Sequence, residues 1–281
     1  MKVADIMTKD VIYVEVPGSR SEVIEIMAKS GKSGLPVVKK GTRKLVGIVT
    51  KSDLLKNPDE EQLALLMTRD PISVKAEDDV KKAVELFVRH GIRRLPVVDE
   101  AGEIVGIVSV ADIVTKVIHR LNFNEPVKNF YSKRIPLVWD KTPLNVAYEI
   151  MRLSGYKYLV ALNDEAKLSG IITEEDIVRS AEIKSMEKKS SSAPSEGTEW
   201  GWDAITIVYI FKKELTIPSD VKVEDVMVKR VITVNEYTSL KECARRMARY
   251  NIDQLPVLNA GGKLVGVIED KDLVSAIANV L

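Results

Sequence analysis

Four copies of one sequence pattern constrain the fold of this chain more than any other feature. A central run recurs as GLPVV, RLPVV, YLVAL and QLPVL, starting at Gly34, Arg94, Tyr158 and Gln254. The third residue of each run lies 29 residues after a landmark, and the landmarks are Met7, Met67, Tyr131 and Met227. An aspartate follows that third residue by 16 or 17 residues, at Asp53, Asp112, Asp176 and Asp272. Fixed spacing among three landmarks in four copies indicates an internal repeat.

Repeat 2 shows the order of elements within one copy. A short strand over Pro71–Val74 precedes a helix over Asp79–His90, whose apolar residues recur at helical spacing and which ends at Gly91. Two β-branched runs follow, and a second helix begins near Val110. We therefore expect an α/β fold of four β-α-β-β-α repeats. Because about 60 residues are marginal for independent stability, the repeats should pair.

The spacing of the copies also divides the chain into segments. We expect repeats over residues 1–60, 61–122, 123–183 and 220–281, with an insertion over residues 184–219. Within the insertion, Lys184–Gly197 has the composition of a polar linker, whereas Trp200–Phe211 is aromatic and β-branched and predicts an extra strand before Pro218. That strand either covers an open sheet edge or builds an oligomer or partner surface.

Composition excludes several classes of protein. With 42 Lys+Arg against 41 Asp+Glu the formal net charge is +1, so the chain has no strongly basic or acidic balance. One cysteine and two histidines are too few for a disulfide framework or a zinc cage. Because no apolar run approaches a membrane span and the start lacks a signal-peptide pattern, we expect a soluble cytoplasmic protein. Few Gln and abundant Lys and Glu hint at a thermophilic source.

The repeats resemble the cystathionine-β-synthase (CBS) domain family. The resemblance rests on three motifs in each repeat: Met-Thr-x-Asp at the start, LPVV in the middle and Gly-h-h-[Ser/Thr]-x-x-Asp at the end, where h is an apolar residue. It covers the whole chain except the insertion, and repeat 3 matches the motifs only in part. In that family two repeats pack about a pseudo-twofold axis into a Bateman module. Four-repeat members resemble the γ subunit of AMP-activated protein kinase, in which two modules form a disc. The resemblance implies a ligand such as AMP, ADP or ATP, less favourably S-adenosylmethionine, and no catalysis.

The last part of each repeat contains the candidate ligand residues. A strand ends at Thr50 and a helix begins, so backbone N–H groups and the Thr50 hydroxyl could hold a phosphate while Asp53 accepts ribose hydroxyls. The matching pairs are Ser109 with Asp112 and Thr173 with Asp176. The alternative is a capping box, which has the same spacing and needs no ligand.

Positive charge and an apolar contact complete the expected site. Arg93 and Arg94 precede the LPVV run of repeat 2, where the family often places basic residues that reach phosphates; they could also be ordinary surface arginines. The resemblance places the adenine near the first strand, at Ile72 in repeat 2. In repeat 4 Glu269 replaces the hydroxyl residue, so we expect that pocket to be empty or to hold an uncharged group.

Two functions remain after these exclusions. The first is a regulatory protein that binds an adenine nucleotide and signals to an effector, and it could form a homodimer. The second is a scaffold that docks on a large complex such as a kinase, transporter or ribosome, with vestigial ligand sites; contact with nucleic acid is less favoured. We do not expect an enzyme, because the chain has no Gly-rich phosphate loop and no paired nucleophile and base.

Overall fold

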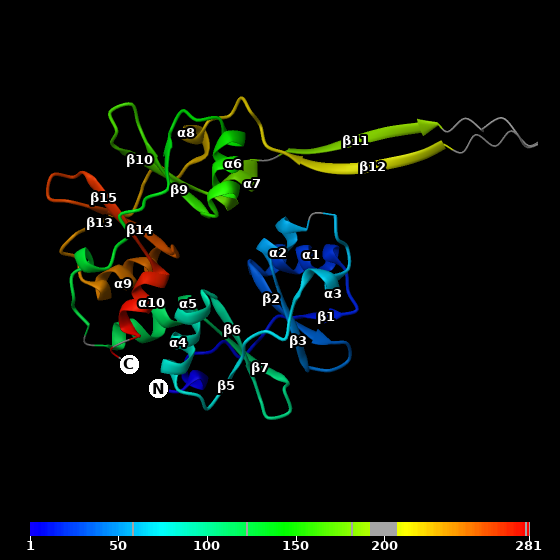
Figure 1. The fold of residues 1–281 in the computed structure, drawn as a ribbon, viewed down its shortest axis with the longest axis horizontal. Helices are drawn as coiled ribbons and strands as arrows, with labels where there is room; N and C mark the ends of the chain where they lie inside the picture. Colours follow the sequence, from blue (N-terminus) through cyan, green and yellow to red (C-terminus); the bar gives the residue numbers. More distant parts are fainter. Residues whose placement is uncertain (58, 122, 181, 192–206, 279, 281) are drawn as a thin grey trace, which may run out of the picture. The chain divides into compact units, whose positions relative to one another are not determined.

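The four repeats fold as the expected β-α-β-β-α units (Figure 1). The computed structural model describes residues 1–57, 59–121, 123–180, 182–191, 207–278 and 280. The chain divides into two compact units: unit 1 is Met1–Tyr131, Val234–Val257 and Val267–Leu281, and unit 2 is Ser132–Thr233 and Leu258–Gly266. The disc of two modules, which concerns how such units sit together, stays a prediction.

The elements follow the repeat order. Repeat 1 contains β1 (Val14–Val16), α1 (Arg20–Ser30), β2 (Gly34–Lys39), β3 (Leu45–Thr50) and α2 (Lys51–Lys56). Repeat 2 contains α3 (Leu63–Leu66), β4 (Thr68–Arg69), β5 (Val74–Lys75), α4 (Val80–His90), β6 (Arg94–Val98), β7 (Ile104–Ser109) and α5 (Val110–Asp112). Repeat 3 contains β8 (Leu137–Trp139), α6 (Leu144–Ser154), β9 (Tyr158–Leu162), β10 (Leu168–Thr173) and α7 (Glu174–Ser180). Repeat 4 contains α8 (Val223–Val226), β13 (Val234–Asn235), α9 (Leu240–Tyr250), β14 (Gln254–Leu258), β15 (Leu264–Glu269) and α10 (Asp270–Ile277).

Local sequence explains where the helix of repeat 2 begins and ends. The Asp79 side chain accepts a hydrogen bond from the Lys81 N–H at 2.9 Å, which caps the start of α4. Gly91 ends α4 in the left-handed conformation, with φ of 62°, which favours glycine. The flanking strand is shorter than expected, because only Val74–Lys75 of this region pair with β6. The closing helix begins at Val110 as expected and continues from α5 into a π-helical turn, η2 (Ile113–Val117).

The repeats pair by exchanging their first segments. The segment that starts repeat 1 bonds to repeat 2, where the Val3 N–H donates to the Asp78 carbonyl at 2.9 Å and Thr8 bridges to Ile107. In return, β4 of repeat 2 adds an antiparallel edge to β3 of repeat 1. Unit 2 contains the corresponding exchange between repeats 3 and 4, because Val228 bridges to Ile171 of β10. A repeat whose core is completed by its neighbour does not have to be stable alone.

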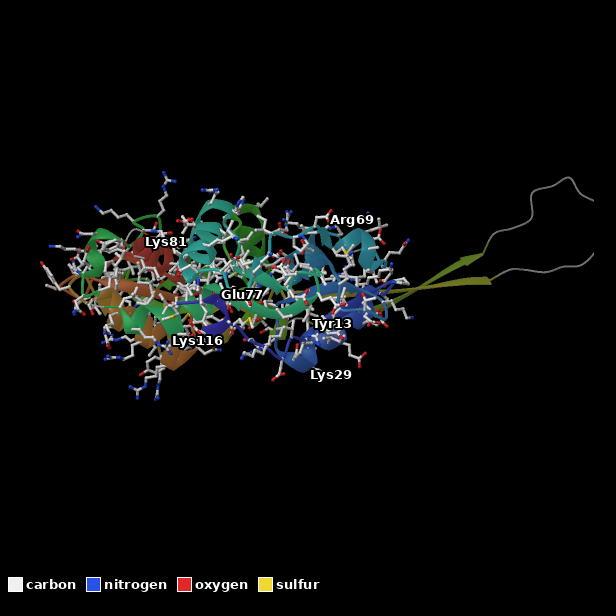
Figure 2. All side chains as sticks on the ribbon, turned by 90° about the horizontal axis from the view of Figure 1, so that it is seen from below. Tyr13, Lys29, Arg69, Glu77, Lys81 and Lys116 are labelled. Atoms are coloured by element: carbon white, nitrogen blue, oxygen red, sulfur yellow. The ribbon has the colours of Figure 1, made fainter. Side chains whose placement is uncertain are left out.

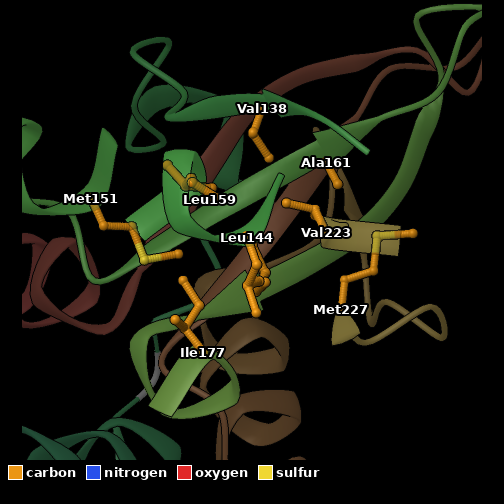
Figure 3. Close-up of a cluster of buried hydrophobic side chains, with 10 residues drawn as sticks. Val138, Leu144, Met151, Leu159, Ala161, Ile177, Val223 and Met227 are labelled. Atoms are coloured by element: carbon orange, nitrogen blue, oxygen red, sulfur yellow. The ribbon is translucent and has the colours of Figure 1, made fainter. Parts of the chain in front are cut away.

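The hydrophobic cores include the exchanged segments. In unit 2 one cluster joins Val138, Leu144, Met151 and other residues of repeat 3 to Val223 and Met227 at the start of repeat 4 (Figure 3). In unit 1 the core of repeat 1 likewise contains Leu63 and Leu66 from the segment that starts repeat 2. Burial of these apolar side chains is the main favourable term that holds each pair of repeats together.

The landmark methionines pack on the glycine of the Gly-h-h-[Ser/Thr] sequence in the paired repeat. A Cβ atom added to Gly106 would lie 2.5 Å from the Met7 sulfur, and one added to Gly47 would lie 2.6 Å from the Met67 sulfur. Gly170 is in the same close contact with Met227. The glycine therefore makes room for the exchanged segment, which explains why these two landmarks recur at fixed spacing.

The insertion differs from its prediction in its first part. Residues expected as a linker from Lys184 onward belong to β11 (Glu182–Ser191), which pairs antiparallel with β12 (Ile207–Thr216) over ten residue pairs. Backbone pairing with β12 gives these polar residues a ladder that their composition does not predict. The last five residues of the expected strand over Trp200–Phe211 belong to β12, and residues 192–206 lie outside the described residues.

Repeats 2 and 4 also pack together within unit 1. Helix α10 lies against α4 and α5, and α9 lies against η2. The first helix of repeat 2, α4, therefore contacts the last helix of repeat 4, and the first helix of repeat 4, α9, contacts the last helical segment of repeat 2. This reciprocal contact is typical of a pseudo-twofold arrangement. This packing brings the residues before β6 close to the start of α10.

Candidate functional site

The Ser/Thr-x-x-Asp residues form capping boxes in repeats 1, 2 and 3. In repeat 1 the Asp53 carboxylate accepts bonds from the Thr50 N–H at 2.8 Å and the Thr50 hydroxyl at 2.7 Å. The pairs Ser109–Asp112 and Thr173–Asp176 make the same two bonds, at 2.6 to 2.9 Å. These contacts match the capping alternative, and the ligand role of the same residues stays a prediction.

The carboxylates of repeats 1 and 2 differ in their second oxygen. Asp112 Oδ1 accepts from the Lys116 ammonium at 2.7 Å, and Lys116, labelled in Figure 2, also donates to the Ile6 carbonyl at 2.6 Å. The bonds of Asp53 to described residues use Oδ2 instead. Asp53 therefore has an oxygen available for a ligand hydroxyl, whereas both oxygens of Asp112 are bonded within the protein.

Arg94 lies between repeats 1 and 2. Its guanidinium donates a short hydrogen bond to the Ser33 hydroxyl, and a Cβ added to Gly34 would lie 3.3 Å from both Arg94 Nη1 and Thr50 Cγ2. Burial lowers the pKa of Arg94, and the positive charge of Arg93 lowers it further. The structure thus places a partly desolvated cation beside Thr50, with no carboxylate in ion-pair contact among the described residues.

Arg93 points to repeat 4 instead. Its Nη2 donates to Asp253 Oδ2 at 3.0 Å and to Asp270 Oδ2 at 2.5 Å. The side chain of Arg93 is 40% exposed and that of Asp270 only 4%. The two arginines that the sequence predicts as phosphate contacts therefore have different partners, and only Arg94 lies beside the Thr50 motif.

The expected adenine contact is an exposed apolar side chain. Ile72 is 36% exposed, and Ile12, at the same position of repeat 1, is 43% exposed. Neither side chain is part of the buried core, although the alternative to an adenine contact was that these isoleucines are ordinary core residues. Exposed isoleucine at both positions is compatible with apolar contact to a planar base.

The corresponding region of repeat 4 is acidic. Burial raises the pKa of Asp270 to about 7 and that of Asp272 to about 6. Asp272 Oδ2 accepts from the Glu269 N–H at 2.9 Å, so the capping bond persists without a hydroxyl residue. Clustered carboxyl groups disfavour a phosphate, and the expectation that this pocket is empty or holds an uncharged group stays a prediction.

Unit 2 contains the remaining candidate pair and a shallow hollow. Thr173 and Asp176 lie at the junction of β10 and α7. The hollow, of about 490 Å³, is lined by Leu137, Val138, Trp139, Leu162, Asn163, Asp164 and Ala166. No predicted site residue lines it, and we base no ligand site on this hollow.

Sequence reasoning missed the partners of the candidate residues. Ser33, Asp253 and Asp270 contact the two arginines, and Lys116 contacts Asp112. One signal was available: Ser33 and Asp253 align with Arg93 when the four repeats are superposed by spacing. Spacing alone does not tell which repeats meet.

Metal sites and membrane-spanning helices are features of other kinds of protein. No three side chains of His, Cys, Asp or Glu come together there in a way that could hold a metal ion. None of the helices described has the length and apolar character needed to cross a bilayer.

Relatives with known sequences match the whole chain or a part of it. Uncharacterized protein MJ1225 of Methanocaldococcus jannaschii is 22% identical over 298 residues, which cover 99% of this chain and 98% of that protein. An inosine-5'-monophosphate dehydrogenase of Korarchaeum cryptofilum is 39% identical over 112 residues, but these cover 40% of this chain and 23% of the enzyme. The second match therefore says nothing about catalysis here.

Solved structures confirm the fold over the full chain. A crystal structure of an uncharacterized conserved protein from Pyrococcus horikoshii has a TM-score of 0.68 at 28% identity, covering 99% of this chain and all of that one. The crystal structure of MJ1225, described as a candidate archaeal homologue of g-AMPK, has a TM-score of 0.74 at 20% identity and the same coverage. The CBS domain matches residues 3–60, 62–119, 127–182 and 223–279. This chain is therefore a member of the CBS domain family, with four CBS domains.

Proposed function

We propose that this chain is a non-catalytic regulatory protein that binds an adenine nucleotide between repeats 1 and 2 and signals its occupancy to a protein partner. The observation that carries the proposal is the position of Arg94. Its guanidinium is half-buried, donates to Ser33 and lies beside Thr50. Partial burial of a cation without an anionic partner is costly, and a ligand phosphate would supply that partner through charge-assisted hydrogen bonds.

Two further groups suit the other parts of a nucleotide. Asp53 can accept a ribose hydroxyl through Oδ1 while its Oδ2 keeps the capping bonds with Thr50. Exposed Ile12 and Ile72 offer apolar surface for an adenine ring. By the same comparison, the pair Ser109–Asp112 is a weaker site because Lys116 occupies the carboxylate, and Thr173–Asp176 is a separate candidate in unit 2.

Regulation would follow from where the ligand binds. Repeats 1 and 2 already share exchanged segments, and a ligand that contacts Thr50 of one and Arg94 of the other favours the arrangement in which both contacts form. A ligand at 100 times its dissociation constant stabilises that arrangement by about 2.7 kcal/mol. Coupling of this size is enough to change the affinity of a partner that contacts either repeat.

Isothermal titration calorimetry and thermal unfolding with AMP, ADP, ATP and S-adenosylmethionine test the proposal. We expect at least one adenine nucleotide to bind and Arg94→Gln to weaken it at least about tenfold. The exposed Arg69, labelled in Figure 2, provides the matched control, because Arg69→Gln removes the same charge elsewhere in unit 1. If none of the four compounds changes a clean unfolding transition, the proposal is rejected and a scaffold with vestigial sites becomes the better function.

A further inference from the structure

One backbone contact recurs at the same place in all four repeats. In each repeat the bond joins the start of the last helix to the residue that lies three positions before the central Pro36, Pro96, Val160 or Pro256. The first residue of the helix donates its backbone N–H to the backbone carbonyl of that earlier residue, at 2.8 to 3.0 Å. We call each such residue pair a corner. The four corners are Ser33–Lys51, Arg93–Val110, Lys157–Glu174 and Asp253–Asp270. Because the backbone is the same, the corners differ only in their side chains.

The corners of repeats 2 and 4 are complementary in charge. Arg93 of one corner donates to both residues of the other, Asp253 at 3.0 Å and Asp270 at 2.5 Å. Asp270 is buried, and among the described residues its Oδ1 has no hydrogen-bond partner. The position that matches Asp270 in repeat 2 is the buried Val110, so an apolar residue fits this place in the fold. The carboxylate is thus not required for packing, and its bond is with Arg93.

These bonds leave a single guanidinium at the proposed nucleotide site. Arg93 and Arg94 are adjacent in the chain, yet Arg94 turns to Ser33 of repeat 1 and Arg93 turns to repeat 4. They remain near enough for the charge of Arg93 to act on Arg94. Next to Arg94, one cation is thus shared by two carboxylates. A phosphate chain extending past Arg94 would meet an arginine that is already bonded to two carboxyl groups.

We propose that Asp253 and Asp270 determine the ligand charge that this site accepts: by holding Arg93, they make it prefer a nucleoside monophosphate over the corresponding triphosphate. This inference rests on the proposed function and specifies its ligand class. A monophosphate needs one guanidinium, which Arg94 supplies. The extra phosphates of a triphosphate need compensation that Arg93, bonded to two carboxylates, does not provide.

Calorimetric dissociation constants for AMP and ATP test the inference on four forms of the full chain. In the wild type we expect AMP to bind more tightly than ATP. In D253N/D270N we expect the ATP affinity to rise at least about tenfold relative to AMP, which is the smallest effect expected from one added hydrogen bond between charged groups. Adding R93Q to these two substitutions should abolish the gain. The control D59N/E77Q removes the same two charges at exposed positions and should leave the ratio unchanged (Glu77 is labelled in Figure 2).

The single substitution Asp253→Asn keeps the test valid if D253N/D270N fails to fold. Asp253 is 54% exposed, so this change keeps the buried Asp270–Arg93 pair and should give a smaller gain, about threefold. Wild-type binding of ATP as tight as that of AMP, or an unchanged ratio in both D253N and D253N/D270N, overturns the inference while leaving the proposed function intact. Absence of binding by any adenine nucleotide removes both.

Discussion

Arg93→Gln is the substitution with the most specific expected consequence. In the wild type Asp270 is 3% exposed, Arg93 is its ion-pair partner at 2.5 Å, and Asp253 is the second acceptor. Glutamine removes the cation and leaves the Asp270 carboxyl group buried. The cost of an unpaired buried carboxylate then depends on whether that carboxylate is ionised, so the effect of the substitution has to depend on pH.

The pKa of Asp270 gives the pH range. Burial raises that pKa from 3.8 to about 7, although Arg93 opposes the rise. Between these values the folded protein keeps a proton that the unfolded chain has lost, so the free energy of unfolding falls as pH rises from about 4 to 7. The difference between 3.8 and 7 corresponds to about 4 kcal/mol. Without Arg93 the pKa rises further, and the fall extends above pH 7.

The expected cost of Arg93→Gln follows from the same numbers. Breaking a buried ion pair by removing one partner costs about 3–5 kcal/mol. Because the Arg93 side chain is 40% exposed and partly solvated, we expect about 2 kcal/mol at about pH 8. At about pH 5.5 Asp270 is protonated in both proteins, and the cost should fall below about 1 kcal/mol.

Chemical denaturation at the two pH values measures this difference. The residues of unit 1 include no tryptophan and Trp139 lies in β8 of unit 2, so far-UV circular dichroism follows both units while tryptophan fluorescence does not report unit 1. Arg93→Gln should shift only the transition that fluorescence does not report. Asp270→Asn should remove the pH dependence between about pH 6 and 7, whereas Asp272, whose pKa is raised to about 6, should keep part of the fall at lower pH. Equal destabilisation by Arg93→Gln at both pH values, or none at the higher one, would refute this reasoning.

Three further outcomes test the packing. Gly106→Ala should destabilise unit 1 by about 1–3 kcal/mol, because the added Cβ would lie 2.5 Å from the Met7 sulfur. Met7→Ala in the same chain should recover part of this loss, which a double-mutant cycle of chemical denaturation measures. The Cys243 thiol is fully buried, and burial raises its pKa to about 12. It should therefore react with a thiol reagent only as fast as unit 1 opens, and rapid labelling of the native protein would contradict its position in the core. Thr173→Ala should cost about 1 kcal/mol in unit 2, seen by fluorescence, because the bonded pair with Asp176 caps α7; no measurable cost would mean that this box is not stabilising.

Local features of the chain could be predicted because their causes are local. The helix of repeat 2 ends at Gly91, where glycine adopts positive φ without a Cβ penalty, and the box at Thr50 and Asp53 joins residues three apart. The linker predicted from Lys184 was wrong over residues 184–191, because polar composition does not reveal that a later segment will pair with these residues.

The sequence by itself determined that this chain has four CBS repeats and which residue types stand at their ligand motifs. The spacing of landmarks is a property of the chain, and each motif is a few residues long. The tertiary structure alone decided the partners: Met7 meets Gly106, and Arg93 meets Asp253 and Asp270, which lie 160 and 177 residues further along the chain. Such contacts depend on how α10 packs against α4, and residues at equivalent positions in repeats cannot reveal which copy will face which. That packing separates Arg93 from Arg94, two neighbours that the sequence alone could not distinguish.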